Sequence, residues 1–342
     1  MGPQVAELEQ KLAAFAGVKH CIACANGTDA LLIVLRAWNI GPGDAVFVPA
    51  FTFAASAEVV ALVGASPVFV DVQEDTYNID PASLEAAIAM VRQSGELRPR
   101  AVMPVDLFGQ PADYRKIEPI AAREGLKMLC DTAQGFGGIL DGRGTGAIGD
   151  AAATSFFPAK PLGCYGDGGA AFTNDDELAD ILRSIRIHGQ GSDKYENIRI
   201  GVNSRLDTIQ AAILLEKLKI FPDEIERREV IAQRYTRALG RSNRIRVPLV
   251  IDGAKSTWAQ YTIQVPERER LQRDLKDKGI PTAVYYPIPL PLQKGYQHYP
   301  SAPIPVTERI SKTVVSLPMH PYLDVAVQDM IVDCVLSSVG VA

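Results

Sequence analysis

The stretch SFFPAKPLGCYGDGG, residues 155–169, carries a single lysine, Lys160, between two prolines and ahead of a glycine cluster. A residue that precedes proline is pushed out of the helical region, so we expect Lys160 on a loop. The glycines allow tight turns and a close approach of the backbone to a ligand. Apolar surroundings lower the pKa of an amine by desolvation and make it a usable nucleophile. By itself, however, the pattern fits a lysine in an ordinary surface turn equally well.

Short apolar runs alternate with helical patterns on both sides of this stretch. The predicted strands cover residues 20–25, 45–48, 67–70, 101–105, 126–130, 152–155 and 170–173. The predicted helices cover residues 30–38, 54–63, 84–91 and 112–123 between the strands, and residues 177–188 after the last strand. Continuously apolar strands are typical of a parallel sheet covered on both faces, and the intervening helices imply right-handed crossovers. The predicted fold class is therefore α/β, with a mostly parallel sheet in an α/β/α large domain.

A change of pattern near Pro222 predicts a second, smaller domain. An apolar helix is expected at residues 209–218 and a charged helix from residue 224, with the proline between them. We therefore assign residues 1–221 to the large domain and residues 222–342 to a small α+β domain. The small domain is expected to contain a strand at residues 261–265 and a helix at residues 268–278. The polar stretch at residues 189–197 is expected to be a mobile loop.

Composition excludes several classes of function. The chain has 35 basic and 40 acidic residues, a net charge of −5, and no basic run interleaved with aromatics, so nucleic acid is not an expected partner. No apolar run approaches the roughly 20 residues that span a bilayer, and the acidic N-terminus is unlike a signal peptide. We therefore expect a cytoplasmic protein without a membrane partner.

The five cysteines do not indicate a disulfide framework. Cys21 and Cys24 form a C-x-x-C pair that fits a redox site or half of a zinc site. The pair lies in an apolar run, and the sequence has no second such pair and no histidine pair at ligand spacing. Buried structural thiols are therefore favoured, and no metal is expected.

Ligands of such folds gather at the carboxyl ends of the strands, where this chain places several polar or aromatic residues. Gly27 and Thr28 begin a helix and suit a phosphate, although an ordinary helix cap is the simpler interpretation. Phe53 suits stacking on a flat ring or plain core packing. Asp131 ends a strand, where it either caps a helix or meets a cation or several hydrogen-bond donors that offset its desolvation. Together with Lys160 they indicate a pyridine cofactor with a phosphate tail more readily than a nicotinamide, because no G-x-G-x-x-G follows the first strand.

Six ordered motifs resemble the DegT/StrS family of nucleotide-sugar aminotransferases, which are fold type I enzymes, over essentially the whole chain. The motifs are ANGTDAL at 25–31, PAFTF at 49–53, DTAQ at 131–134, SFFPAKPLG at 155–163, GVNSRLD at 201–207 and SLPMHP at 316–321. The resemblance implies pyridoxal 5′-phosphate (PLP) as cofactor and pyridoxamine 5′-phosphate as its half-reaction form. It implies ping-pong transfer of an amino group from L-glutamate, which leaves as 2-oxoglutarate, to a keto-sugar nucleotide in bacterial surface-polysaccharide biosynthesis.

The resemblance also implies the roles of the residues around the cofactor. Lys160 is implied as the Schiff-base lysine and catalytic acid/base, and Asp131 as the partner of the pyridinium nitrogen. Gln134 is implied to lie against the ring near its phenolic oxygen, and Phe53 to pack on the ring face. The residues implied to hold the phosphate are Gly27, Thr28 and Ser155.

Further residues are implied on the substrate side. Asn203 would reach the phosphate of the neighbouring subunit, in a homodimer that activity requires. Arg205 and Tyr286 would approach the sugar, and the arginine suits the carboxylate of a UDP-2-acetamido-3-oxo-glucuronate. At Tyr285 enzymes for that substrate have a histidine, and at Pro291 many family members have one. Since tyrosine offers no cation, a neutral 3-oxo or 4-oxo deoxysugar nucleotide stays open as the acceptor.

Three other activities are disfavoured. A branch of the family performs dehydration, but its lysine is replaced by histidine, and Lys160 argues against it. A PLP-binding regulator without turnover would have no need to keep Lys160, Asp131 and Gln134 together. Sulfur removal from cysteine would need a mobile nucleophilic thiol. Cys164 is the one candidate near the lysine, and the match to the sugar aminotransferase family outweighs it.

Overall fold

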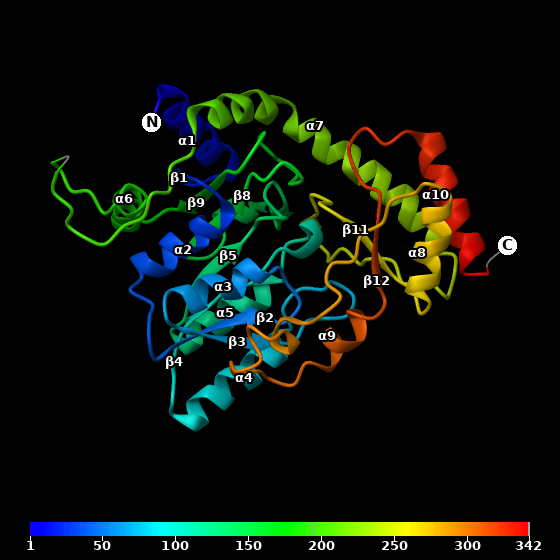
Figure 1. Ribbon diagram of the computed structural model, residues 1–342, viewed down its shortest axis with the longest axis horizontal. Helices are drawn as coiled ribbons and strands as arrows, with labels where there is room; N and C mark the ends of the chain where they lie inside the picture. Colours follow the sequence, from blue (N-terminus) through cyan, green and yellow to red (C-terminus); the bar gives the residue numbers. More distant parts are fainter. Residues whose placement is uncertain (194, 341–342) are drawn as a thin grey trace.

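The computed structural model describes residues 1–193 and 195–340, and a seven-stranded sheet forms its centre (Figure 1). The strands are ordered β1-β9-β8-β5-β4-β2-β3. Their bounds are His20–Cys24 (β1), Asp44–Pro49 (β2), Ser66–Val70 (β3), Arg98–Val102 (β4), Lys127–Asp131 (β5), Ala151–Ser155 (β8) and Gly169–Thr173 (β9). The strands from β8 to β3 are parallel, and β9 is antiparallel to both β8 and β1. The predicted α/β class with a mostly parallel sheet is confirmed.

Helices cover both faces of this sheet, because each helix buries one apolar stripe against it. One core joins the sheet to α1 (Pro3–Ala16), α4 (Pro81–Ser94), α5 (Tyr114–Glu124) and the first half of α7 (Thr208–Leu239). The core on the other face joins it to α2 (Gly27–Ala37), α3 (Ala54–Leu62) and α6 (Asp176–Ile185). Cys21 and Cys24 are buried in different cores, on opposite sides of β1, as structural thiols.

The topology brings several strand ends to one edge of the sheet. The parallel strands β2, β4, β5 and β8 all end there, and β1 ends there too because two antiparallel pairings restore its direction. Gly169, which begins β9, pairs with both Cys24 at the end of β1 and Ser155 at the end of β8. Residues that follow these strands, distant in sequence, therefore lie close in space.

A single helix, α7, replaces the two helices predicted around Pro222. The proline lies inside the helix, where it removes one backbone hydrogen bond and favours a break. Phe221 is fully buried, with its ring 6.4 Å from that of Phe136. The first half of α7 packs into the core of the large sheet and the second half into a separate core (Figure 1). Burial at both ends holds the helix together, and the predicted break is wrong.

The separate core that receives the second half of α7 surrounds a small antiparallel sheet of β11 (Tyr261–Gln264) and β12 (Val314–Leu317). The helices α8 (Arg268–Asp277) and α10 (Val325–Ser338) pack on it. The other short elements are β6 (Ile139–Leu140), β7 (Arg143–Gly144), β10 (Ala254–Lys255), α9 (Pro305–Ile310) and the 3-10 helices η1 (Leu107–Gly109), η2 (Thr145–Ala147) and η3 (Leu290–Leu292). The division into domains 1–221 and 222–342 stays a prediction.

Within the described ranges, none of the helices has the length and apolar character that crossing a bilayer requires. The described residues of the predicted loop 189–197 form turns and a bridge between Gln190 and Asn197, whereas Lys194 lies outside the described residues.

Candidate active site

Lys160 lies on the loop between β8 and β9, as predicted. The loop is tightly folded, because the Lys160 amide donates to the Phe157 carbonyl and the Cys164 amide to that of Phe156, at 2.8 and 2.7 Å. Phe156 and Leu162 are buried and anchor the loop, while Lys160 is half-buried. Burial lowers the pKa of its amine and nearby Asp131 opposes that shift. The structure therefore favours a partly desolvated lysine over one in a solvated turn.

Asp131 ends β5 and is 5% exposed. Its Oδ2 accepts a hydrogen bond from the Ser56 hydroxyl at 2.8 Å, and its Oδ1 accepts one from the Ala133 amide at 3.1 Å. Burial raises the pKa of this carboxyl, whereas the two donors and the charge of Lys160 oppose the rise. The residues after Asp131 form turns rather than a helix, so the alternative of a helix cap is wrong. The charges of Asp131 and Lys160 thus influence each other at the carboxyl edge of the sheet, where the neighbouring strands β5 and β8 end.

The first turn of α2 lies beside the end of β8. The side chain of Asn26 caps this helix by accepting from the Asp29 amide at 2.8 Å, which leaves the amides of Gly27 and Thr28 without an intrahelical acceptor. Gly27 packs so closely on Ser155 that an added Cβ would lie 2.6 Å from the Ser155 Cβ. The turn is therefore both a helix cap and a place where an anion finds backbone donors.

An aromatic wall stands next to Asp131. Phe53 is the N-cap residue of α3 and is 57% exposed, which excludes its alternative as plain core. Its ring centroid lies 6.4 Å from that of Tyr286. Gln134 links this wall to the strand end, because its Nε2 donates to the Tyr286 hydroxyl at 3.3 Å and its Oε1 accepts from the Phe108 amide at 2.6 Å. Tyr285 is half-buried beside Tyr286, with the ring centroids 5.8 Å apart.

Asn203 and Arg205 are exposed on the two sides of Ser204. The Ser204 hydroxyl accepts from the Ala25 amide at 3.1 Å, so this segment lies beside the turn that begins α2. Neither Asn203 nor Arg205 is placed against Lys160 by any contact within the described chain.

Ser56 is a site residue that the sequence analysis missed. A signal was present, because Thr52 and Ser56 are four residues apart at the start of a predicted helix, and such residues share one helical face. Nothing in the sequence, however, indicates which strand end that face meets.

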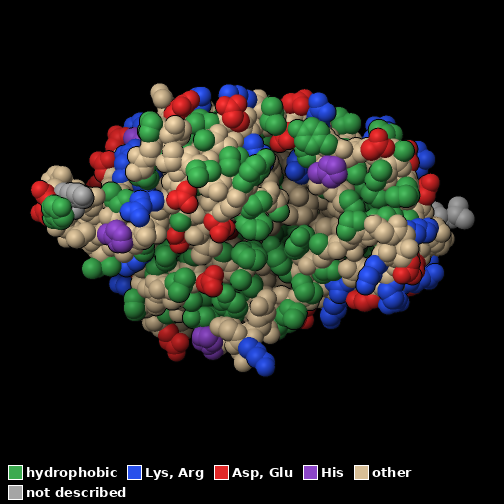
Figure 2. Space-filling model, turned by 45° about the horizontal axis from the view of Figure 1, so that its top comes forward, with side chains coloured by type: hydrophobic (Ala, Val, Ile, Leu, Met, Phe, Trp, Pro, Cys, Tyr) green, Lys and Arg blue, Asp and Glu red, His purple; other side chains and the backbone are tan. Residues whose placement is uncertain are grey.

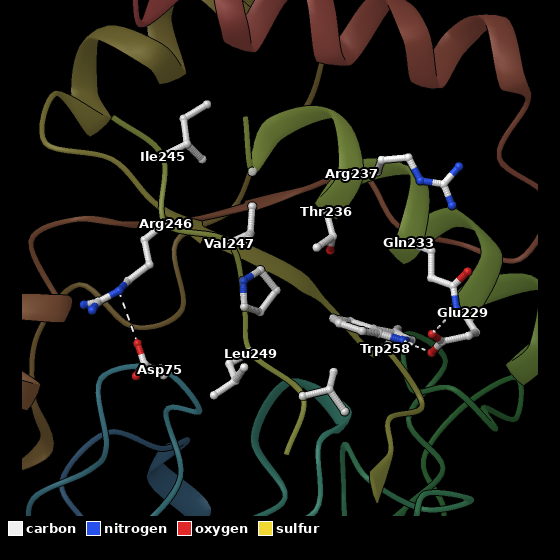
Figure 3. Close-up of a pocket in the computed structure, with 13 residues that line it drawn as sticks. Asp75, Glu229, Gln233, Thr236, Arg237, Ile245, Arg246, Val247, Leu249 and Trp258 are labelled. Carbon is white, nitrogen blue, oxygen red and sulfur yellow. Dashed lines mark hydrogen bonds and ion pairs between the residues drawn. The ribbon is translucent and has the colours of Figure 1, made fainter. Parts of the chain in front are cut away.

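A separate groove of about 750 Å³ lies between the second half of α7 and residues 245–250 (Figure 3). Trp258 lies at its floor, and its Nε1 donates to Glu229 at 2.6 Å. Arg246 on the opposite side is paired with Asp75. None of the predicted site residues lines this groove, so it is not the candidate active site.

The residues at the sheet edge fit PLP. Asp131 is held by two donors, yet a carboxylate accepts about four hydrogen bonds, so it has capacity for a protonated ring nitrogen. The desolvated amine of Lys160 suits the aldehyde carbon, and the free amides at the start of α2 suit a phosphate.

Comparisons with known proteins agree with this fit. The DegT/DnrJ/EryC1/StrS aminotransferase family matches residues 1–336. The chain is 51% identical to the UDP-2-acetamido-2-deoxy-3-oxo-D-glucuronate aminotransferase of Pseudomonas aeruginosa, over 95% of this chain and 88% of that protein. It is 41% identical to the UDP-N-acetyl-3-dehydro-alpha-D-glucosamine 3-aminotransferase of Acidithiobacillus ferrooxidans, over 94% and 85%. The crystal structure of a DegT/DnrJ/EryC1/StrS aminotransferase from Brucella abortus, 56% identical, superposes with a TM-score of 0.98 and covers 99% of this chain and 91% of that one.

Proposed function

The chain belongs to the DegT/DnrJ/EryC1/StrS aminotransferase family, and we propose that it transfers an amino group from L-glutamate to UDP-2-acetamido-3-oxo-glucuronate or a close relative of it. It is a PLP-dependent nucleotide-sugar aminotransferase. The observation that carries the proposal is the placement of two groups: buried Asp131 ends β5, and Lys160 lies on the loop that follows the neighbouring parallel strand β8, where burial lowers the pKa of its amine. A role in surface-polysaccharide biosynthesis and a cytoplasmic location are parts of the same proposal.

Six residues of this chain would hold the cofactor, three at its ring and three at its phosphate. Asp131 would accept from the ring nitrogen, and Phe53 would pack on the ring beside Gln134. The residues proposed to hold the phosphate are Gly27, Thr28 and Ser155. When bound, PLP supplies an aldehyde carbon for the amine and a ring that accepts electrons.

Lys160 would carry out the proton transfers. Since burial lowers the pKa of its Nζ, more of the amine is unprotonated near neutral pH than in an exposed lysine. Nζ would take the proton from the amino-bearing carbon of the substrate and deliver it to the carbon of the cofactor that bears the aldehyde in free PLP, which is the work of a general acid/base. The charge of Asp131 stabilises Nζ once it is protonated, so the pair suits both directions of transfer.

The acceptor sugar is the finer part of the proposal. Arg205 is exposed and offers a guanidinium suited to a uronate carboxylate. The identity of 51% to the glucuronate enzyme favours that substrate, whereas Tyr285 in place of a histidine favours a neutral sugar like that of the relative from A. ferrooxidans.

We expect L-glutamate to convert the PLP form of the protein to the pyridoxamine 5′-phosphate form, with loss of the visible absorption band. The band should return on addition of UDP-2-acetamido-3-oxo-glucuronate, and more slowly in Arg205→Lys, because lysine lacks the two-pronged geometry of arginine. Return with UDP-N-acetyl-3-dehydroglucosamine alone would assign the neutral sugar. A band unchanged by glutamate would contradict glutamate as the donor.

A homodimer is also proposed, with Asn203 reaching the phosphate of the neighbouring subunit. Large apolar side chains are exposed near the site or on segments that lead to it: Tyr165 76%, Ile200 79% and Ile209 73%. The face in Figure 2 shows hydrophobic side chains spread across its middle, with most charged ones nearer its edges. Exposed apolar area of this kind is what stable dimers bury.

Mixing two inactive variants tests shared sites. If Asn203 completes the site of the other subunit, then Asn203→Ala and Lys160→Ala, refolded together, should form dimers with one intact site. We expect roughly a quarter of the wild-type activity per subunit, from random pairing. No recovery, or a monomer by ultracentrifugation, would contradict the proposal.

A further inference from the structure

A chain of buried side chains leads from the start of α3 to Asp131. Thr52 Oγ1 lies 3.1 Å from Ser56 Oγ, and Ser56 Oγ lies 2.8 Å from Asp131 Oδ2. The exposed fractions of Thr52, Ser56 and Asp131 are 2%, 0% and 5%. Bulk water therefore has little access to replace either hydrogen bond.

The direction of the two hydrogen bonds follows from the carboxylate. Ionised Asp131 only accepts, so Ser56 gives it its single hydroxyl proton. Ser56 must then accept from the Thr52 hydroxyl. Hydrogen bonds arranged in one direction polarise one another, so the Thr52 donor strengthens the bond from Ser56 to Asp131.

The position of Ser56 adds a second favourable interaction. Ser56 is in the first turn of α3, whose N-cap residue is Phe53, and the positive end of a helix dipole stabilises a nearby anion. The Ala133 amide holds the other carboxylate oxygen. The carboxylate plane is thus fixed at both oxygens.

We propose that Ser56, supported by Thr52, is a positioning residue that keeps Asp131 ionised and oriented toward the ring nitrogen of the cofactor. The inference rests on the proposed role of Asp131. Ser56 is fully buried and would act through Asp131.

The same contact opposes the effect of burial on the carboxyl. Burial raises the pKa of Asp131, and the Ser56 hydroxyl is the largest influence that lowers it, ahead of the Ala133 amide and Lys160. The other titratable groups that interact with Asp131 are Asp106, whose own pKa is raised to about 7, and Tyr286. Ser56→Ala therefore moves the loss of the Asp131 charge to higher pH.

The test is a titration of the full-length apoprotein with pyridoxamine 5′-phosphate, which makes no covalent bond to Lys160, followed by fluorescence. Ser56→Ala should bind this probe roughly 10- to 100-fold more weakly, as expected for a lost hydrogen bond to a charged group. When the pH is lowered, Ser56→Ala should begin to lose affinity for the probe at a higher pH than the wild type does. Ser56→Thr, which keeps the hydroxyl, should bind within a few-fold of the wild type.

Two further variants separate this role from a merely structural one. Ser311→Ala removes a buried hydroxyl whose one hydrogen bond within the described residues is to the Glu308 carbonyl, and it should bind like the wild type. Ser56→Ala with Asp131→Asn should bind no more than a few-fold more weakly than Asp131→Asn alone, because both changes remove one interaction. Circular dichroism checks that each variant is folded.

Three results would overturn the inference. If Ser56→Ala binds the probe with wild-type affinity while Asp131→Asn binds it weakly, Ser56 has no positioning role and the proposed function is unaffected. Strictly additive losses in the double variant would mean that Ser56 acts elsewhere. Normal affinity in Asp131→Asn would overturn the role of Asp131 itself, and the inference with it.

Discussion

Lys160→Ala is expected to abolish amino transfer and to remove the visible band of the lysine-bound cofactor. The side chain is the only amine on the loop between β8 and β9, and its Nζ is proposed both to bind the cofactor and to move the proton. A positioned acid/base alone contributes roughly 10²- to 10⁴-fold to a rate, so a loss of at least this size is expected in kcat. Steady-state turnover and the absorption spectrum measure the two effects separately.

Lys255→Ala is the matched control for this variant. Lys255 is exposed and pairs with Glu226 at 3.2 Å, an interaction worth little in solvent. We expect wild-type turnover and a wild-type spectrum. Full turnover in Lys160→Ala as well would contradict the assignment of Lys160 and make PLP-independent chemistry the better hypothesis.

Asp131→Asn should lower kcat by roughly 10- to 1000-fold, the equivalent of one to three pKa units in the partner that loses its counter-charge. Asparagine has nearly the same shape, so the loss reports on charge rather than packing. The pKa of Lys160 should fall further, because Asp131 is the one influence identified that raises it. The pH dependence of kcat measures both effects.

The same substitution has an opposite effect on stability. Burial raises the pKa of folded Asp131 above its unfolded value. At a pH between the two values the folded state therefore binds more protons than the unfolded state, and stability falls as the pH rises across that window. Ionised Asp131 therefore costs stability at neutral pH, and the neutral asparagine should leave the Tm of the apoprotein unchanged or raised. A large drop in Tm would mean that lost activity reflects misfolding. Asp252→Asn, an exposed change, should alter neither property.

Much of the fold was predictable because the decisive patterns are local. Continuous apolar runs and 3.6-residue periodicity located the strands and helices of the large domain. A strand that is buried on both faces of a parallel sheet needs apolar residues at successive positions, and this pattern is visible in the sequence. The order of these elements implied right-handed crossovers and hence an edge where strand ends meet. Lys160 and Asp131 were identifiable because each follows or ends a strand at that edge.

The sequence by itself thus determined the fold class and, with its family motifs, the cofactor, because these depend on residue type, spacing and order; the roles of Lys160 and Asp131 stay predictions. Only the tertiary structure decided that α7 continues through Pro222, since the burial of Phe221 and of the helix on either side outweighs one lost hydrogen bond. It also decided that Phe53 is exposed and that Ser56 reaches Asp131, 75 residues away. Such contacts depend on how elements pack across the sheet, and no local pattern encodes which strand end a helix will face.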